Sequence, residues 1–176
     1  FTRNHRKYEE IESISPANFI TEIFDPHKTT WMLWSSCILN RQLLLKIGKI
    51  PNYGSPHLAD HALIGMVGSK GGGVIVNKRY SHLTSHDTNY SKFNFEYYVH
   101  GCKGFYDTMD SFCKEADISD SSMLVVRKHL YYWFIANIFT LKRYYTVIKP
   151  DSNSVKRVND CAKEILTFHF MRKVFL

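Results

Sequence analysis

The second half of the chain carries apolar residues at helical spacing over long distances, and this pattern restricts the fold more than any other feature. Leu130, Phe134 and Leu141, for example, are separated by four and seven residues, so they fall on one face of a helix. Such a face is normally buried against neighbouring elements. The sequence therefore predicts three successive helices, at about residues 93–115, 120–146 and 152–172.

The first half of the chain has a different texture, because short apolar runs alternate with turn residues. Within the run that follows residue 57, Leu63, Ile64 and Val67 have the spacing of an inward helix face. In order, the sequence predicts a helix from Pro16 to Phe24 with Ser15 as its N-cap, a helix over about 39–47 that ends at Gly48, a helix over about 57–68, and a short buried strand over 74–76.

The composition supplies enough apolar material for a packed core, because 44% of the residues are hydrophobic and 15% are aromatic. We predict an α+β fold that is predominantly helical. Its two expected regions are residues 1–92, with mixed structure, and residues 93–176, which are mostly helical. The four cysteines include no C-x-x-C pair, and isolated cysteines among apolar neighbours are typical of a reducing setting.

The net charge of +7 favours partners that carry negative charge. However, the basic residues are spread along the whole sequence rather than gathered in one block. This distribution argues against a dedicated nucleic-acid-binding arm, and no known nucleic-acid-binding motif is present. A basic nucleic-acid-binding module nevertheless stays open as one alternative function.

Several short motifs follow one another between residues 30 and 92. They are an aromatic stretch ending in Ser35-Ser36, Asn40-Arg41-Gln42-Leu43-Leu44, Ile47-Gly48-Lys49-Ile50-Pro51, Leu58-Ala59-Asp60-His61-Ala62-Leu63, a glycine turn with a strand, and His86-Asp87-Thr88-Asn89-Tyr90-Ser91. This order resembles the later half of family 2 glycosyltransferases, which have the GT-A fold. In that family a Glu-Asp pair precedes an apolar helix, and a motif of the form His-x-x-Asn-x-Ser follows the next strand.

The resemblance implies an inverting glycosyltransferase that moves a sugar from a nucleotide-sugar donor to a hydroxyl acceptor, in polysaccharide or glycan biosynthesis. Residues 1–92 would be the acceptor-side, C-terminal part of the GT-A catalytic domain, and residues 93–176 a helical C-terminal region. The family's nucleotide-binding half and its Asp-x-Asp motif are not in this sequence. A divalent cation, Mg or Mn, is therefore expected only in a longer enzyme, and the chain alone is expected to be inactive.

Asp60 matches the second member of the family's Glu-Asp pair, which implies the role of catalytic base. A sugar hydroxyl attacks efficiently only when a positioned group accepts its proton. The dipole of the predicted helix also favours an ionised carboxylate at its N-terminus. Position 59 departs from the family pattern, because Ala59 stands where the family usually has Glu.

The resemblance implies further site residues on both sides of Asp60. His86 matches the motif histidine that reaches the metal or the diphosphate in such enzymes. Substrate contacts are expected from aromatic faces that stack on sugar rings, from a small polar residue, and from cations that meet phosphate. The residues expected to bind substrate are Trp31, Trp34, Ser36, Arg41 and Arg79.

A zinc-binding hydrolase is the other alternative function. His57 and His61 lie four residues apart, so both would lie on one helix face as zinc ligands must. The pattern resembles the inverted zinc motif His-x-x-Glu-His, with Asp60 in place of the glutamate. No third ligand is evident in the sequence.

The expected location is the cytoplasm, with peripheral contact on the inner face of a membrane as an open question. No apolar run reaches the roughly 18 residues that a membrane span needs. Three basic pairs among aromatic residues are compatible with an anionic bilayer that carries a lipid-linked acceptor. These pairs are Arg127-Lys128, Lys142-Arg143 and Arg172-Lys173. A homodimer is a further open possibility.

Overall fold

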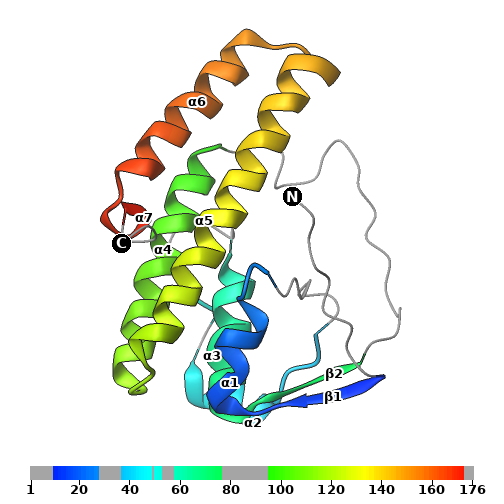
Figure 1. Cartoon of the computed structure of the whole chain (residues 1–176), viewed down its shortest axis with the longest axis vertical. Helices are drawn as coiled ribbons and strands as arrows, with labels where there is room; N and C mark the ends of the chain where they lie inside the picture. Colours follow the sequence, from blue (N-terminus) through cyan, green and yellow to red (C-terminus); the bar gives the residue numbers. More distant parts are fainter. Residues whose placement is uncertain (1–9, 28–36, 49, 53–57, 77–94, 173–176) are drawn as a thin grey trace.

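The computed structural model describes residues 10–27, 37–48, 50–52, 58–76 and 95–172 (Figure 1). Within these residues helices predominate and two strands form one small sheet, so the predicted, predominantly helical class is confirmed. The elements in order are β1 (Ile11–Ile14), α1 (Pro16–Ile23), α2 (Arg41–Ile47), α3 (Ala59–Gly71), β2 (Gly73–Val76), α4 (Phe95–Glu115), α5 (Asp120–Arg143), the π-helical turn η3 (Tyr144–Ile148), α6 (Ser152–Thr167) and α7 (His169–Arg172).

The three helices predicted in the first half are present, and their first turns are held in different ways. Ser15 precedes α1 as expected, but its side chain makes no capping hydrogen bond. Pro16, whose fixed φ suits a first helical turn, begins this helix instead. Asn40 caps α2, because its Oδ1 accepts hydrogen bonds from the backbone N–H of Gln42 at 2.9 Å and of Leu43 at 3.1 Å. Both helices thus begin within two residues of their predicted starts.

The two-stranded sheet corrects the sequence prediction in two respects. β1 was not predicted; it pairs antiparallel with β2, with Ile11 opposite Val76 and Ile14 opposite Gly73. The predicted strand over 74–76 is present as β2, but the prediction that it is buried is wrong. Val74 is 62% exposed and Val76 is 44% exposed. The protein core covers only one face of this narrow sheet, so alternate side chains of β2 face solvent.

Helix α3 is the centre of the first half. It packs against α1, α2 and α4, and its side chains are buried almost continuously from Ala62 to Gly68. A helix that is apolar on every side is typical of such a central position. Two glycines allow close neighbours, because Gly65 lies against the ring of Phe24 and Gly68 against the ring of Phe19. The predicted inward face of this helix is therefore confirmed.

The second half consists of long helices packed side by side (Figure 1). The predicted stripe on α5 is confirmed, since Leu130 and Phe134 are fully buried and Leu141 is 6% exposed. The buried side chains of both halves form one continuous cluster, in which α3 packs on α4 and α1 packs on α5. The functional division at residue 92 stays a prediction.

Two helix ends in the second half differ from the predicted ends. Helix α5 stops at Arg143 and continues as the π-turn η3, in which the N–H of Lys149 donates to the carbonyl of Tyr144 at 2.8 Å. Helix α6 ends at Thr167 because Phe168 adopts an extended backbone, with ψ of 132°. The predicted single helix over 152–172 is therefore two helices, α6 and the short α7.

Along the described ranges, no helix combines the length and the apolar character that crossing a bilayer requires.

Candidate functional site

Most of the residues expected to form the site lie outside the described residues. These are Trp31, Trp34, Ser36, Arg79 and His86, together with His57 of the zinc alternative. Their roles stay predictions. Asp60, His61 and Arg41 are described, and Asp60 is the residue around which the site can be built.

Asp60 is the second residue of α3, and an unusual backbone conformation at Leu58 leads into this helix. Leu58 has φ 63° and ψ 2°, a left-handed conformation that costs a bulky residue on the order of 1–3 kcal/mol. Burial of its side chain, which is 3% exposed, offsets this cost. The Leu58 carbonyl then accepts the first hydrogen bond of the helix, from Ala62 N–H at 2.9 Å. The entry angle of α3, and with it the place of Asp60, is thereby fixed.

The carboxylate of Asp60 is partly buried and close to the first backbone N–H groups of α3. Its Oδ1 accepts a hydrogen bond from the backbone N–H of His61 at 2.9 Å. The carboxylate also lies at the positive end of the helix dipole. Within the part of the chain that the structure describes, the other carboxylate oxygen accepts no hydrogen bond, so only one of the two oxygens is held in this way.

The surroundings of position 59 give a physical reason for an alanine there, where the resemblance leads us to expect a glutamate. Its side chain is 6% exposed, on the buried side of the first turn of α3. A buried carboxylate at this position would need a partner to offset its desolvation. The small apolar side chain therefore fits the packing around α3, whereas Asp60, one residue later, remains accessible in part.

His61 connects the first turn of α3 to helix α5. Its Nδ1 lies 3.3 Å from Nε2 of His129, and the two rings are tilted by 45°. The ring of His129 also packs against Phe24, with 4.9 Å between ring centroids, and against Phe105 at 6.3 Å. The residue next to Asp60 is thus held by a side chain from another helix.

Both histidines are neutral at neutral pH. The pKa of His129 is lowered to about 3, chiefly by burial and also by repulsion from a protonated His61, while a backbone hydrogen bond at Phe24 opposes the change. Burial also lowers the pKa of His61, and the Asp60 carboxylate opposes that change. A neutral pair needs one donor and one acceptor. One of the two facing nitrogens, Nδ1 of His61 or Nε2 of His129, therefore donates and the other accepts, according to the tautomers of the two rings.

His129 was not recognised as a site residue from the sequence. The available signal was its helical spacing: it lies three residues after Val126, which is fully buried, and one residue before Leu130 on the inner side of α5. That spacing indicates an inward histidine. It does not indicate the partner, because His61 is 68 residues away in the sequence.

Arg41 is exposed at the first residue of α2. This helix packs near the C-terminal end of α3, where Leu43 lies against Gly71. Asp60 is eleven residues from Gly71, which is about 16 Å along a helix axis. The packing of α2 therefore places Arg41 toward the opposite end of α3 from Asp60, and its predicted contact with substrate stays a prediction.

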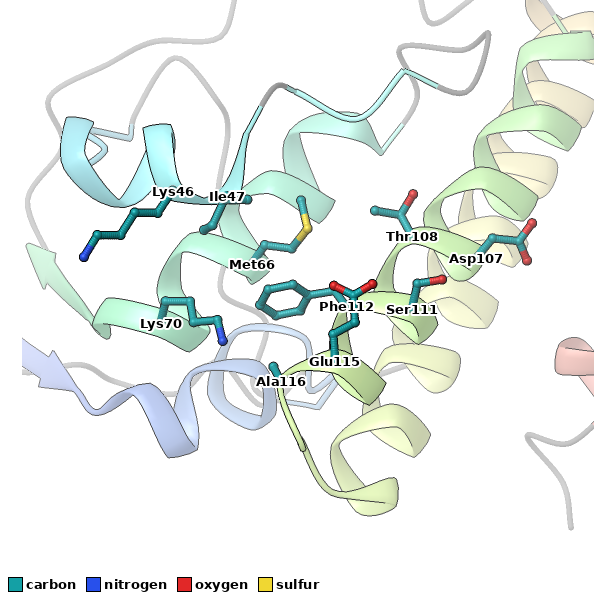
Figure 2. Close-up of a pocket in the computed structure, with 10 residues that line it drawn as sticks. All are labelled: Lys46, Ile47, Met66, Lys70, Asp107, Thr108, Ser111, Phe112, Glu115 and Ala116. Carbon is teal, nitrogen blue, oxygen red and sulfur yellow. The ribbon is translucent and has the colours of Figure 1, made fainter.

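An open pocket of about 620 Å³ lies between α2, the second half of α3 and α4 (Figure 2). Asp60 does not line it. Figure 2 shows the Lys70 side chain turned toward the α4 side of the pocket, and its Nζ lies 5.5 Å from the centroid of the Phe112 ring. The lining residues are Lys46, Ile47, Met66, Lys70, Asp107, Thr108, Ser111, Phe112, Glu115 and Ala116.

Among the described residues, no three His, Cys, Asp or Glu side chains come together as candidate metal ligands. His61, one of the two ligands of the zinc alternative, faces His129 instead. The expected divalent cation of a glycosyltransferase therefore finds no fitting set of ligands among the described residues.

Comparison with known proteins gives no match among protein-family models, curated proteins or solved structures.

Proposed function

We propose that this chain is the acceptor-side part of an inverting glycosyltransferase similar to family 2, with Asp60 as the catalytic base. The position of Asp60 carries the proposal. It lies in the first turn of the central helix α3, and a glycine turn and strand β2 follow that helix, in the order that the resemblance requires. Asp60 is partly buried, and one carboxylate oxygen is fixed by the backbone N–H of His61.

The chemistry assigned to Asp60 is proton transfer coupled to bond formation. The acceptor hydroxyl oxygen attacks the anomeric carbon of the donor sugar, and a new C–O bond forms as the bond to the diphosphate breaks. The hydroxyl proton passes to Asp60, and the electron pair of the broken bond leaves with the diphosphate. Such a positioned base contributes typically about 10²–10⁴-fold to the rate.

The remaining parts of the machinery lie outside the described residues of this chain. A divalent cation would neutralise charge on the leaving diphosphate, but the described side chains offer no ligand set for it. The nucleotide-sugar donor and a glycan or lipid-linked acceptor are the proposed ligands. The chain is accordingly proposed to need a nucleotide-binding half for turnover.

The test compares Asp60→Asn with Asp107→Asn in the longest natural chain that contains these residues. Asp107 is exposed on α4, where it forms a surface ion pair with Lys103, so it is a matched acidic control. Sugar transfer is measured with a panel of nucleotide sugars. We expect Asp60→Asn to lower kcat about 10²-fold or more and Asp107→Asn to leave it unchanged.

Two outcomes would contradict the proposal. Unchanged kcat in Asp60→Asn, with native folding verified by circular dichroism, would exclude the role of base. Robust sugar transfer by the 176-residue chain alone would contradict the inferred need for a nucleotide-binding half.

A further inference from the structure

The connection between α5 and α6 lies at one end of the molecule's long axis, and the two-stranded sheet lies at the other end (Figure 1). Helix α5, the π-turn η3 and helix α6 form a helical hairpin whose arms pack on each other. We call residues 142–157 the hairpin tip. In Figure 1 the tip extends beyond the other drawn helices.

The π-turn η3 separates buried from exposed apolar side chains at the tip. Tyr145 is 7% exposed and belongs to the core. Val147 and Ile148, in the same turn, are 68% and 66% exposed. Phe139, on α5 about two turns earlier, is 69% exposed. Two neighbouring aliphatic side chains thus face solvent at the end of the molecule, although burial in an apolar medium would stabilise them.

Basic side chains accompany this exposed aliphatic pair at the hairpin tip. The tip contains five basic residues, all exposed, and a single acidic residue. The acidic residue, Asp151, is engaged as the cap of α6: it accepts from the N–H of Asn153 at 3.1 Å and from the hydroxyl of Ser154 at 2.6 Å. The basic residues are Lys142, Arg143, Lys149, Lys156 and Arg157.

The basic pair on the middle of α5 has a different environment. Arg127 packs over the ring of Tyr106 at 5.8 Å, and its Nη2 donates to the Tyr106 hydroxyl at 3.4 Å. Lys128 beside it is only partly exposed. These contacts direct Arg127 toward α4. Charge and exposed aliphatic surface coincide at the hairpin tip and not at this pair.

We propose that the hairpin tip docks on an anionic membrane surface. Val147 and Ile148 enter the boundary between headgroups and acyl chains, and the lysines and arginines of the tip meet anionic headgroups. An exposed aliphatic pair on a tip with five exposed basic residues matches this layered partner. Nucleic acid would match the charge, but aliphatic side chains offer it no stacking surface. The proposal is independent of the proposed glycosyltransferase function.

The test is co-sedimentation of the 176-residue chain with phosphatidylcholine vesicles that contain or lack phosphatidylserine. Binding is expected only with phosphatidylserine and should weaken as salt is added. Lys142→Gln with Arg143→Gln removes two tip charges and should weaken binding by about 25-fold, since each basic residue near such a surface contributes about fivefold. Lys114→Gln with Lys163→Gln removes the same charge from exposed positions outside the tip, and binding should change less than about twofold.

A second pair of variants tests the apolar contribution. Val147→Asn with Ile148→Asn should weaken vesicle binding at least about tenfold by removing the inserted side chains. Ile38→Asn with Leu45→Asn changes two exposed aliphatic residues at and before α2 and should leave binding unchanged. Thermal unfolding followed by circular dichroism verifies that each variant is folded.

Each other outcome overturns the proposal. Equal loss in the two charge variants would mean that only net charge attracts the chain. Absence of vesicle binding by the unchanged chain would exclude a membrane partner. In a further outcome, the mass of the protein in solution, measured without lipid, differs between the unchanged chain and the Val147→Asn Ile148→Asn variant. That difference would assign the tip to contact between two copies of the chain. The tip would be assigned to nucleic acid by two results together. An oligonucleotide would compete fully with the vesicles, and its binding would depend on the tip charges but not on Val147 and Ile148.

Discussion

His61 Nδ1 and His129 Nε2 lie 3.3 Å apart and join the first turn of α3 to helix α5. The contact brings together residues that are 68 positions apart in the sequence, directly beside Asp60. In this hydrogen bond an unprotonated nitrogen of one ring must accept from the other ring. Protonation of the accepting ring removes the acceptor, so this link between helices depends on pH.

Acidification should weaken the fold through this pair. The pKa of His129 falls from the ordinary 6.5 to about 3 on burial, so the unfolded chain binds the proton more readily than the folded chain. Stability is therefore complete above about pH 6.5 and declines as the pH falls toward 3. By pH 5 the loss from His129 is about 2 kcal/mol. Urea unfolding between pH 7 and pH 5 measures this decline.

His129→Gln, which does not titrate, should remove most of the decline between pH 7 and pH 5. His100 is exposed on α4, so His100→Gln should keep it. Equal pH dependence of the unchanged chain and His129→Gln would show that other groups cause the acid sensitivity.

Ala59→Glu introduces the residue that family 2 glycosyltransferases, which this chain resembles, usually have at this position. We nevertheless expect it to destabilise this protein. Ala59 is 6% exposed, and a carboxylate there would be buried without a partner. We expect a loss of about 2 kcal/mol or more in the free energy of unfolding, measured with urea. Ala136→Glu, at an exposed position of α5, should change it by less than about 0.5 kcal/mol. A stable Ala59→Glu variant would mean that the first turn of α3 has room for the family's glutamate.

Gly68→Ala should destabilise the protein by overpacking the contact between α1 and α3. An added Cβ would overlap the Phe19 ring at three atoms, and Phe19 is itself buried. Overpacking of this kind costs about 1–3 kcal/mol, more than the helix propensity that alanine adds. At Gly71 the same Cβ meets chiefly the end of the Leu43 side chain, which can rotate. The midpoint of thermal unfolding should therefore fall more for Gly68→Ala than for Gly71→Ala, and the reverse order would contradict the packing described here.

Cys113 should react slowly with iodoacetamide in the folded protein. The pKa of its thiol is raised from 9.0 to about 11, chiefly by burial and also by the Asp110 carboxylate. The reactive thiolate is then about a hundredfold rarer at pH 8. Peptide mass spectrometry after brief alkylation should find Cys113 unmodified in buffer and modified in urea. Rapid modification in buffer, with the fold intact, would show that the thiol is accessible.

The sequence was sufficient to predict the helices, because their cause is local. The spacing of Leu130 and Phe134 is a property of one helix, and the structure buries both. The glycine at the end of α2 and the proline at the start of α1 are equally local signals. Two helix ends escaped this reasoning. Helix α5 passes into the π-turn η3 at Tyr144, and the extended backbone at Phe168 ends α6 within an otherwise helical pattern.

Features that depend on distant partners could not be predicted in this way. Strand β1 is four residues long and includes polar Glu12 and Ser13, and it pairs with a strand about sixty positions later. The contact of His61 with His129 likewise requires the packing of α3 near α5. Of the site, the sequence predicted Asp60 at a helix start, and the structure bears out that placement; its role as base stays a prediction.

The π-turn at the end of α5 has an evolutionary consequence. A π-turn holds one residue more than the α-helical turn that it replaces, so residues beyond it are rotated by about 100° without a break in the helix. Here it begins at Tyr144, after the last buried position of α5 at Leu141. A natural gain or loss of one residue after Tyr145, which still belongs to the core, would re-aim Val147 and Ile148 while the core stripe stays in register. The outer end of this hairpin can therefore diverge between species at little cost to the fold.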